Sequence, residues 1–206
     1  MASTGDNVKD ENCLGYAARD QVQPQVVLMK GTCFSLSEIC PASAAPLLCA
    51  GITVYTPMMR HNMNKPGKSL GVIGLGGLGH LAVIFGKAFG MVVRVFSSSL
   101  LKKEESLNLL GADKFVLSTN EEEMKGMANS LDFIINSASA DIPFDQYLPL
   151  LKTAGVLSDM LRFPSQVKFS TANLNLGMKT ISGSATGGTK QTQEMLDFLC
   201  CQQNLP

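Results

Sequence analysis

The chain has 206 residues, of which 45% are hydrophobic and 17% charged, and its 17 basic and 17 acidic residues give a net charge of zero. This length suits one full domain and a remnant of another better than two complete domains. The balanced charge gives no electrostatic reason to expect nucleic acid or an anionic membrane as a partner. Residues 1–12 are polar and lack the apolar core of a secretory signal, and no apolar run is long enough to span a bilayer. We therefore expect a cytoplasmic protein with no membrane partner.

Six cysteines and two histidines are the residues best suited to bind zinc. None of the cysteine pairs has CxxC spacing, so the sequence predicts no structural zinc site built from closely spaced cysteines. In a cytoplasmic chain of this size, we expect the cysteines to be free thiols or metal ligands and not disulfides.

The first quarter of the chain is the least informative part. Residues 1–40 carry no motif, and only residues 26–29 resemble a strand. Residues 44–55 are small and apolar, which predicts a buried helix that ends near Pro57. The asparagines, proline and glycine of residues 60–67 then predict a turn.

A glycine-rich turn between two apolar strands is the most informative feature. The strands are predicted at residues 70–73 and 92–96, and the first leads into a turn and a helix. Gly74 allows a sharp turn out of the strand, Gly76 lets phosphate approach the backbone, and Gly79 lets helix and strand pack closely. Because the start of the helix has free N–H groups and a positive dipole, this order predicts binding of a dinucleotide pyrophosphate.

The rest of the chain alternates between helices and strands. Further strands are predicted at residues 115–117, 131–136, 155–159 and 180–185. Further helices are predicted at residues 100–110, 119–129, 143–151 and 189–201, the second with a capping box from Thr119 and Glu122. This alternation predicts an α/β fold of the Rossmann type, a doubly wound parallel sheet with strand order 3-2-1-4-5-6.

The residues after the second strand of this unit indicate the cofactor. An acidic residue there would bind the ribose 2′-hydroxyl of NAD, but this sequence has Ser97, Ser98 and Ser99, followed by Lys102 and Lys103. Hydroxyl and ammonium groups suit a 2′-phosphate, so the pattern favours NADP. The alternative is a serine-rich loop with a solvated basic helix start.

Four segments together resemble plant cinnamyl alcohol dehydrogenases, which are zinc-containing medium-chain dehydrogenases. They are PLLCAGITVYTPM (46–58), PGKSLGVIGLGGLGHLAV (66–83), KKEESLNLLGAD (102–113) and TKQTQEMLDF (189–198). The resemblance implies an NADP-dependent enzyme of lignin biosynthesis that interconverts hydroxycinnamyl aldehydes and alcohols. In that family zinc polarises the carbonyl and NADPH donates hydride. Plant mannitol dehydrogenases share the same segments, so the small-molecule aldehyde or alcohol substrate stays open.

The resemblance also assigns roles to individual residues. Cys49 matches the third protein ligand of the catalytic zinc, although a small core residue on an apolar helix is the alternative. His80 belongs to the family's glycine loop, and we interpret it as structural. The residues that match cofactor contacts are Thr53, Gly74, Leu75, Gly76, Gly77, Leu78, Gly79, Ser97, Ser98, Ser99, Lys102, Ser137, Ser184, Ala185 and Thr186.

The family's two other zinc ligands, a cysteine and a histidine followed by glutamate, have no counterpart in this sequence. No catalytic residue is therefore identified, because one cysteine cannot hold a catalytic zinc. We expect residues 1–40 to be a remnant or divergent end of the zinc-binding catalytic domain, residues 41–65 a linking helix and turn, and residues 66–206 an NADP-binding Rossmann domain that is truncated at its C-terminus.

Three functional hypotheses follow. The first is an NADP-dependent, zinc-type alcohol dehydrogenase by descent. The second is a binding module that holds NADP without turnover, which the missing zinc ligands favour. The third is a role in assembly, because related enzymes form homodimers by joining the sheet edges of this domain.

Overall fold

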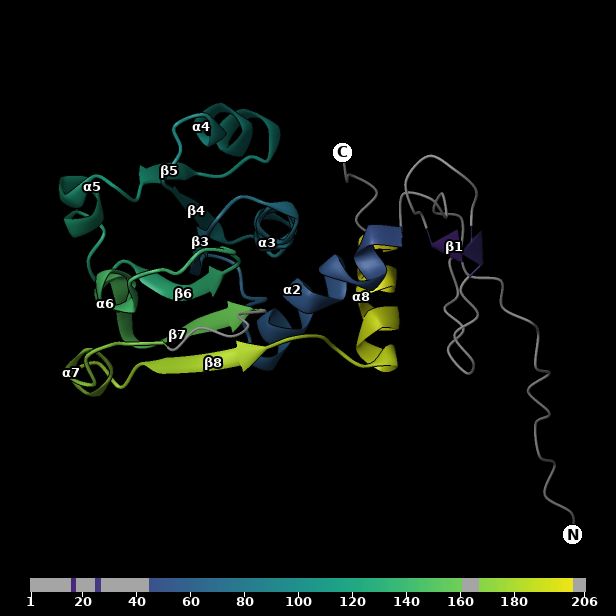
Figure 1. Cartoon of the computed structure of the whole chain (residues 1–206). Coiled ribbons are helices and arrows are strands. Elements are labelled where there is room, and N and C mark those ends of the chain that lie inside the picture. Colours follow the sequence, from purple (N-terminus) through teal and green to yellow (C-terminus); the bar gives the residue numbers. More distant parts are fainter. Residues whose placement is uncertain (1–15, 18–24, 27–44, 161–166, 202–206) are drawn as a thin grey trace, which may run out of the picture.

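The computed structural model describes residues 16–17, 25–26, 45–160 and 167–201. Six strands form one sheet in the order β5-β4-β3-β6-β7-β8, and each neighbouring pair is parallel (Figure 1). Since β3 is the first strand of the unit, this is the predicted order 3-2-1-4-5-6. The Rossmann-type α/β fold is therefore confirmed.

The strands of the sheet are β3 (Ser69–Ile73), β4 (Val92–Ser97), β5 (Lys114–Leu117), β6 (Leu131–Asn136), β7 (Leu151–Met160) and β8 (Thr180–Ser184). The helices are η1 (Ala45–Leu48), α2 (Ala50–Arg60), α3 (Gly77–Ala88), α4 (Lys102–Glu104), η2 (Glu105–Leu109), α5 (Glu121–Lys125), α6 (Phe144–Tyr147), η3 (Leu148–Leu150), α7 (Ala172–Asn175) and α8 (Thr189–Cys201). A separate antiparallel pair joins β1 (Tyr16–Ala17) and β2 (Gln25–Val26). The strand expected at 26–29 overlaps β2 at Val26, and its other residues lie outside the described part.

Side chains at alternate strand positions enter two hydrophobic clusters, one on each face of the sheet. Val72 and Ile135 join a cluster with residues of α2, α3 and α8, whereas Ile73 and Ile134 join a cluster with residues of α5, α6 and η3. Burial on both faces explains why neighbouring residues in the middle of these strands are apolar, as in parallel strands generally. None of the helices in the described residues is long and apolar enough to cross a lipid bilayer.

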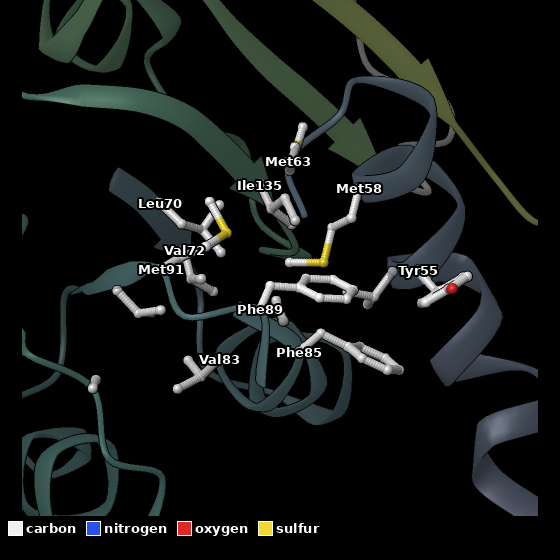
Figure 2. Close-up of a cluster of buried hydrophobic side chains, with 14 of the residues drawn as sticks. Tyr55, Met58, Met63, Leu70, Val72, Val83, Phe85, Phe89, Met91 and Ile135 are labelled. Carbon is white, nitrogen blue, oxygen red and sulfur yellow. The ribbon is translucent and has the colours of Figure 1, made fainter. Parts of the chain in front are cut away.

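The aromatic centre of the first cluster fixes α2 against α3 (Figure 2). The ring of Tyr55 lies 5.6 Å from that of Phe85 and 6.2 Å from that of Phe89, measured between centroids. Phe89 also lies 5.0 Å from Phe198 of α8. These tilted contacts, within the range of favourable aromatic pairs, hold the three helices together.

Helix α2 does not end near Pro57, as the sequence suggested. It continues to Arg60 with Pro57 inside it. A proline in this place removes the backbone hydrogen bond to Thr53, four residues earlier, and its ring crowds the Thr53 carbonyl. Met58 is fully buried beyond the proline, and its burial stabilises the extra turn.

The N-cap of α5 was predicted one residue too early. The cap is Asn120, whose Oδ1 accepts hydrogen bonds from the backbone N–H groups of Glu122 and Glu123 at 3.0 and 3.3 Å. Thr119 and Glu122 therefore form no capping box. Glu123 instead accepts from the backbone N–H of Leu117 at 3.0 Å, which ties the helix to the end of β5.

Two other predicted helices are shorter or irregular. The helix expected at 100–110 is one turn of α-helix, α4, followed by the π-helical turn η2. Its expected cap Gly111 does have the left-handed conformation, with φ +70°. The helix expected at 143–151 ends earlier, because β7 begins at Leu151, paired with Leu131 before a register shift.

Candidate cofactor-binding site

The glycine loop lies at the carboxyl end of β3 and leads into α3. Gly74 has φ +82°, and a Cβ there would lie 3.0 Å from the backbone of Ala138. A Cβ at Gly79 would overlap the carbonyl oxygen of Gly74, so close packing requires glycine at both positions. Added Cβ atoms at Gly76 and Gly77 would meet no atom within 4 Å. The loop is thus tightly packed on its inner side and open on its outer side.

The open side exposes the start of α3. Its N-cap, Gly76, provides no side-chain hydrogen bond to the first turn. The free N–H groups of that turn are therefore available to an anion, and the helix dipole favours negative charge there. The loop therefore fits the diphosphate of a dinucleotide. No Cβ obstructs its approach, and the backbone N–H groups can donate to its oxygens.

Ser137 connects the glycine loop to the next strand of the sheet. It follows β6, and its backbone N–H donates to the carbonyl oxygen of Ile73 at 2.9 Å. Its hydroxyl lies 3.0 Å from the carbonyl oxygens of both Ile73 and Gly74. β3 and β6 are the neighbours between which the strand order reverses, which is where ligands bind in open α/β sheets.

Thr53 and Ala185, both predicted to contact the cofactor, meet in the structure. The Thr53 hydroxyl lies 3.1 Å from the carbonyl oxygen of Ala185 and 2.8 Å from that of Cys49. Figure 1 shows why: α2 crosses the carboxyl ends of β7 and β8, and Ala185 directly follows β8. Ser184 ends that strand, and Thr186 is exposed beside Ala185.

The serines and lysine predicted to bind a 2′-phosphate lie after β4. Ser98 is exposed, whereas the Ser97 hydroxyl accepts a hydrogen bond from the backbone N–H of Ser99 at 3.2 Å. The ammonium of Lys102 lies 2.8 Å from Oε2 of Glu105. Hence Ser98 is open to solvent, but Lys102 is already paired with a carboxylate.

Glu105 was not recognised from the sequence. Its other oxygen, Oε1, lies 2.7 Å from Nε2 of His80, and Nδ1 of His80 lies 2.7 Å from the carbonyl oxygen of Gly76. Hydrogen bonds from Lys102 and His80 lower the pKa of Glu105. The structural interpretation of His80 agrees with these contacts. The i,i+3 spacing of Lys102 and Glu105 was a signal that could have revealed the pair.

A second polar contact missed from the sequence lies at the ends of β6 and β7. The side-chain amide of the buried Asn136 donates to Oδ1 of Asp159 at 2.6 Å, and its oxygen accepts from the backbone N–H of Ala138 at 3.2 Å. These bonds hold the segment that packs against Gly74.

Cys49, the predicted zinc ligand, is exposed immediately before α2. Within the described residues, no group of three or more His, Cys, Asp or Glu side chains could hold a metal ion. Cys13, Cys33 and Cys40 lie outside the described part of the chain. The described residues therefore do not fit a catalytic zinc, which needs three protein ligands.

Comparisons with known proteins agree with this architecture. Residues 77–200 match the family model of zinc-binding dehydrogenases. The chain is 55% identical over 193 residues to a rice protein named probable cinnamyl alcohol dehydrogenase 1. This alignment covers 93% of this chain and 54% of the relative.

Two solved structures are also similar. A cinnamyl alcohol dehydrogenase of Sorghum bicolor superimposes with a TM-score of 0.79 at 43% identity, over 82% of this chain and 48% of that one. CAD from Helicobacter pylori, complexed with NADP(H), superimposes with a TM-score of 0.72 at 34% identity, over 82% of this chain and 48% of that one.

This chain spans about half the length of these relatives. The family match, however, covers the helix that begins in the glycine loop, Ser137 and the segment around Ala185. The chain belongs to the zinc-binding dehydrogenase family, whose relatives named above are alcohol dehydrogenase-type oxidoreductases.

Proposed function

We propose that this chain binds NADP(H) as the cofactor-binding part of an oxidoreductase that interconverts hydroxycinnamyl aldehydes and alcohols. The observation that carries the proposal is the open glycine loop at the switch point of the sheet, with Ser98 and Lys102 after the neighbouring strand. The names of the similar rice and sorghum proteins, and the NADP(H) in the H. pylori complex, support the substrate class and the cofactor.

Each part of the site has a task in this proposal. The N–H groups at the start of α3, after Gly76, bind the diphosphate, and Ser98 and Lys102 bind the 2′-phosphate. Thr53 and Ala185 hold the two segments on the nicotinamide side together. Bound NADPH supplies the hydride for aldehyde reduction.

The alternative is a module that binds NADP without turnover. It is favoured by one observation: in the part of the chain that the structure describes, no group of three or more His, Cys, Asp or Glu side chains could hold a metal ion. For the substrate, the alternative is that of a mannitol dehydrogenase-like enzyme or of another aldehyde reductase of the same family.

The proposal also includes homodimers joined at an edge strand of the sheet, β5 or β8. Light scattering measures the mass of the chain in solution and tests this.

Zinc content and turnover, measured side by side, separate these alternatives. The purified chain is titrated with NADPH, analysed for zinc, and assayed with NADPH and coniferaldehyde, with a chelator-treated sample as control. We expect NADPH to bind, little zinc, and negligible aldehyde reduction by this chain alone, because Cys49 lacks partner ligands in the described residues. Stoichiometric zinc with turnover would contradict the inactive-module alternative, and failure to bind NADPH would contradict the proposed function.

A further inference from the structure

The lysine expected to bind the 2′-phosphate is held by an acidic side chain of its own helical segment. The ammonium of Lys102 lies 2.8 Å from Glu105, and the side chains of the pair are 42% and 30% exposed. Glu105 is the first residue of the π-helical turn that follows α4. A phosphate that approaches Lys102 would therefore meet a carboxylate as well as an ammonium.

His80 fixes this carboxylate in place. Both ring nitrogens of His80 face acceptors at 2.7 Å, the carbonyl oxygen of Gly76 and the carboxylate of Glu105. Hydrogen bonds from Lys102 and His80 lower the pKa of Glu105 and favour its ionised form. The contacts thus run from the glycine loop through His80 and Glu105 to Lys102.

We infer that Glu105 is a specificity-determining residue, because its carboxylate competes with the 2′-phosphate of the cofactor for the ammonium of Lys102. This inference rests on the proposed NADP-binding function. Because His80 holds Glu105 from the other side, the carboxylate cannot move away freely when a phosphate arrives. While Glu105 holds the ammonium of Lys102, a 2′-phosphate gains less from that cation, which weakens binding of 2′-phosphorylated nucleotides. NAD has no 2′-phosphate, so Glu105 affects the preference between the two cofactors and not dinucleotide binding in general.

The test compares two small nucleotides that differ in the 2′-phosphate. Isothermal titration calorimetry measures the Kd of the full 206-residue chain for 2′,5′-ADP and for 5′-AMP. For Glu105→Gln, we expect affinity for 2′,5′-ADP to rise about three- to ten-fold, while affinity for 5′-AMP changes by less than about two-fold. The matched control is Glu104→Gln, which makes the same charge change at an exposed position one residue earlier. Its effect on either ligand should stay below about two-fold.

A second background tests whether the competition is for Lys102. With Lys102→Met already present, Glu105→Gln should raise affinity for 2′,5′-ADP by less than about two-fold. If Glu105→Gln raised affinity for 2′,5′-ADP equally in both backgrounds, Glu105 would not be competing for Lys102, and the inference would be overturned. Unchanged or weaker 2′,5′-ADP binding by Glu105→Gln, with 5′-AMP unchanged, would also overturn it, since Glu105 would then be neutral or would position Lys102 favourably.

Thermal unfolding shows whether Glu105→Gln is folded, and if it is not, Glu105→Ala is tested for the same selective gain. If a folded variant shows no selective rise in affinity for 2′,5′-ADP, the inference is overturned. The native chain tests the proposed function separately. If it binds 2′,5′-ADP no more tightly than 5′-AMP, the proposed NADP preference itself fails.

Discussion

The hydroxyl of Thr53 lies 3.1 Å from the carbonyl oxygen of Ala185, 132 residues further along the chain. This contact joins α2 to the segment after β8 and is made by a residue that is only 3% exposed. The two segments predicted to contact the cofactor are thus part of one packed unit.

Replacing Thr53 by valine removes a hydroxyl that is shared by two acceptors, the carbonyl oxygens of Cys49 at 2.8 Å and Ala185 at 3.1 Å. Valine has nearly the same shape but cannot donate, so Thr53→Val should lower the free energy of unfolding by about 1 kcal/mol. Urea denaturation measures the change. Thr53→Ser keeps the hydroxyl and should retain the hydrogen bond. If both variants were equally destabilised, loss of packing and not of the hydrogen bond would be responsible.

The glycine loop allows stability and cofactor binding to be separated. A methyl group at Gly79 would overlap the Gly74 carbonyl oxygen, so Gly79→Ala should cost about 1–3 kcal/mol of stability. At Gly77 an added Cβ meets no atom within 4 Å, so Gly77→Ala should fold normally. It should nevertheless bind NADPH more weakly, because the methyl group points into the open side of the loop.

Gly188→Ala is a suitable control for both loop variants. An added Cβ at Gly188 also meets no atom within 4 Å, and the residue lies outside the loop. Its melting temperature and its NADPH affinity should both match the native values. Normal stability of Gly79→Ala would show that the loop packs less tightly than the structure indicates.

The far end of the sheet should show a pH-dependent contribution to stability. Burial would raise the pKa of Asp132, but hydrogen bonds from Lys152, the Ser69 N–H and Lys68 lower it from 3.8 to about 2. The unfolded chain therefore binds the proton more tightly than the folded chain. The stabilisation, about 2 kcal/mol, is complete above the unfolded pKa and is lost as the pH falls towards 2.

Asp132→Asn should accordingly lower the free energy of unfolding at pH 7, and the difference from the native chain should shrink at acidic pH. Urea denaturation at a series of pH values measures it. Asp197→Asn, at an exposed position of α8, should show a much smaller difference. A difference for Asp132→Asn that did not depend on pH would contradict a role for the ionised carboxylate.

The sequence predicted the elements whose cause is local. Glycine spacing located the turn from Gly74 to Gly79, and apolar runs located the buried strands, so the strand order could be predicted. The cap at Asn120 was missed because Thr119 has an equally suitable side chain and spacing. The continuation of α2 through Pro57 was missed because the burial of Met58, a tertiary effect, outweighs the lost backbone hydrogen bond.

Contacts between distant segments were beyond pattern analysis. Resemblance brought Thr53 and Ala185 into one site, but nothing in the sequence showed that they touch. Likewise, His80 and Glu105 are 25 residues apart, and only the packing of α3 beside η2 brings them within 2.7 Å. Lys102 was predicted as an available cation when it is in fact paired; its i,i+3 spacing from Glu105 was a local signal of that pair, whereas the contact of Glu105 with His80 was not visible in the sequence.

The most direct test of the account is a fluorescence titration of the chain with NADPH and NADH. If Ser98 and Lys102 bind the 2′-phosphate, the native chain should bind NADPH about ten-fold or more tightly than NADH. The double variant Ser98→Ala with Lys102→Met should bind the two cofactors with nearly equal affinity. Equal affinities of the native chain for NADPH and NADH would contradict the central claim.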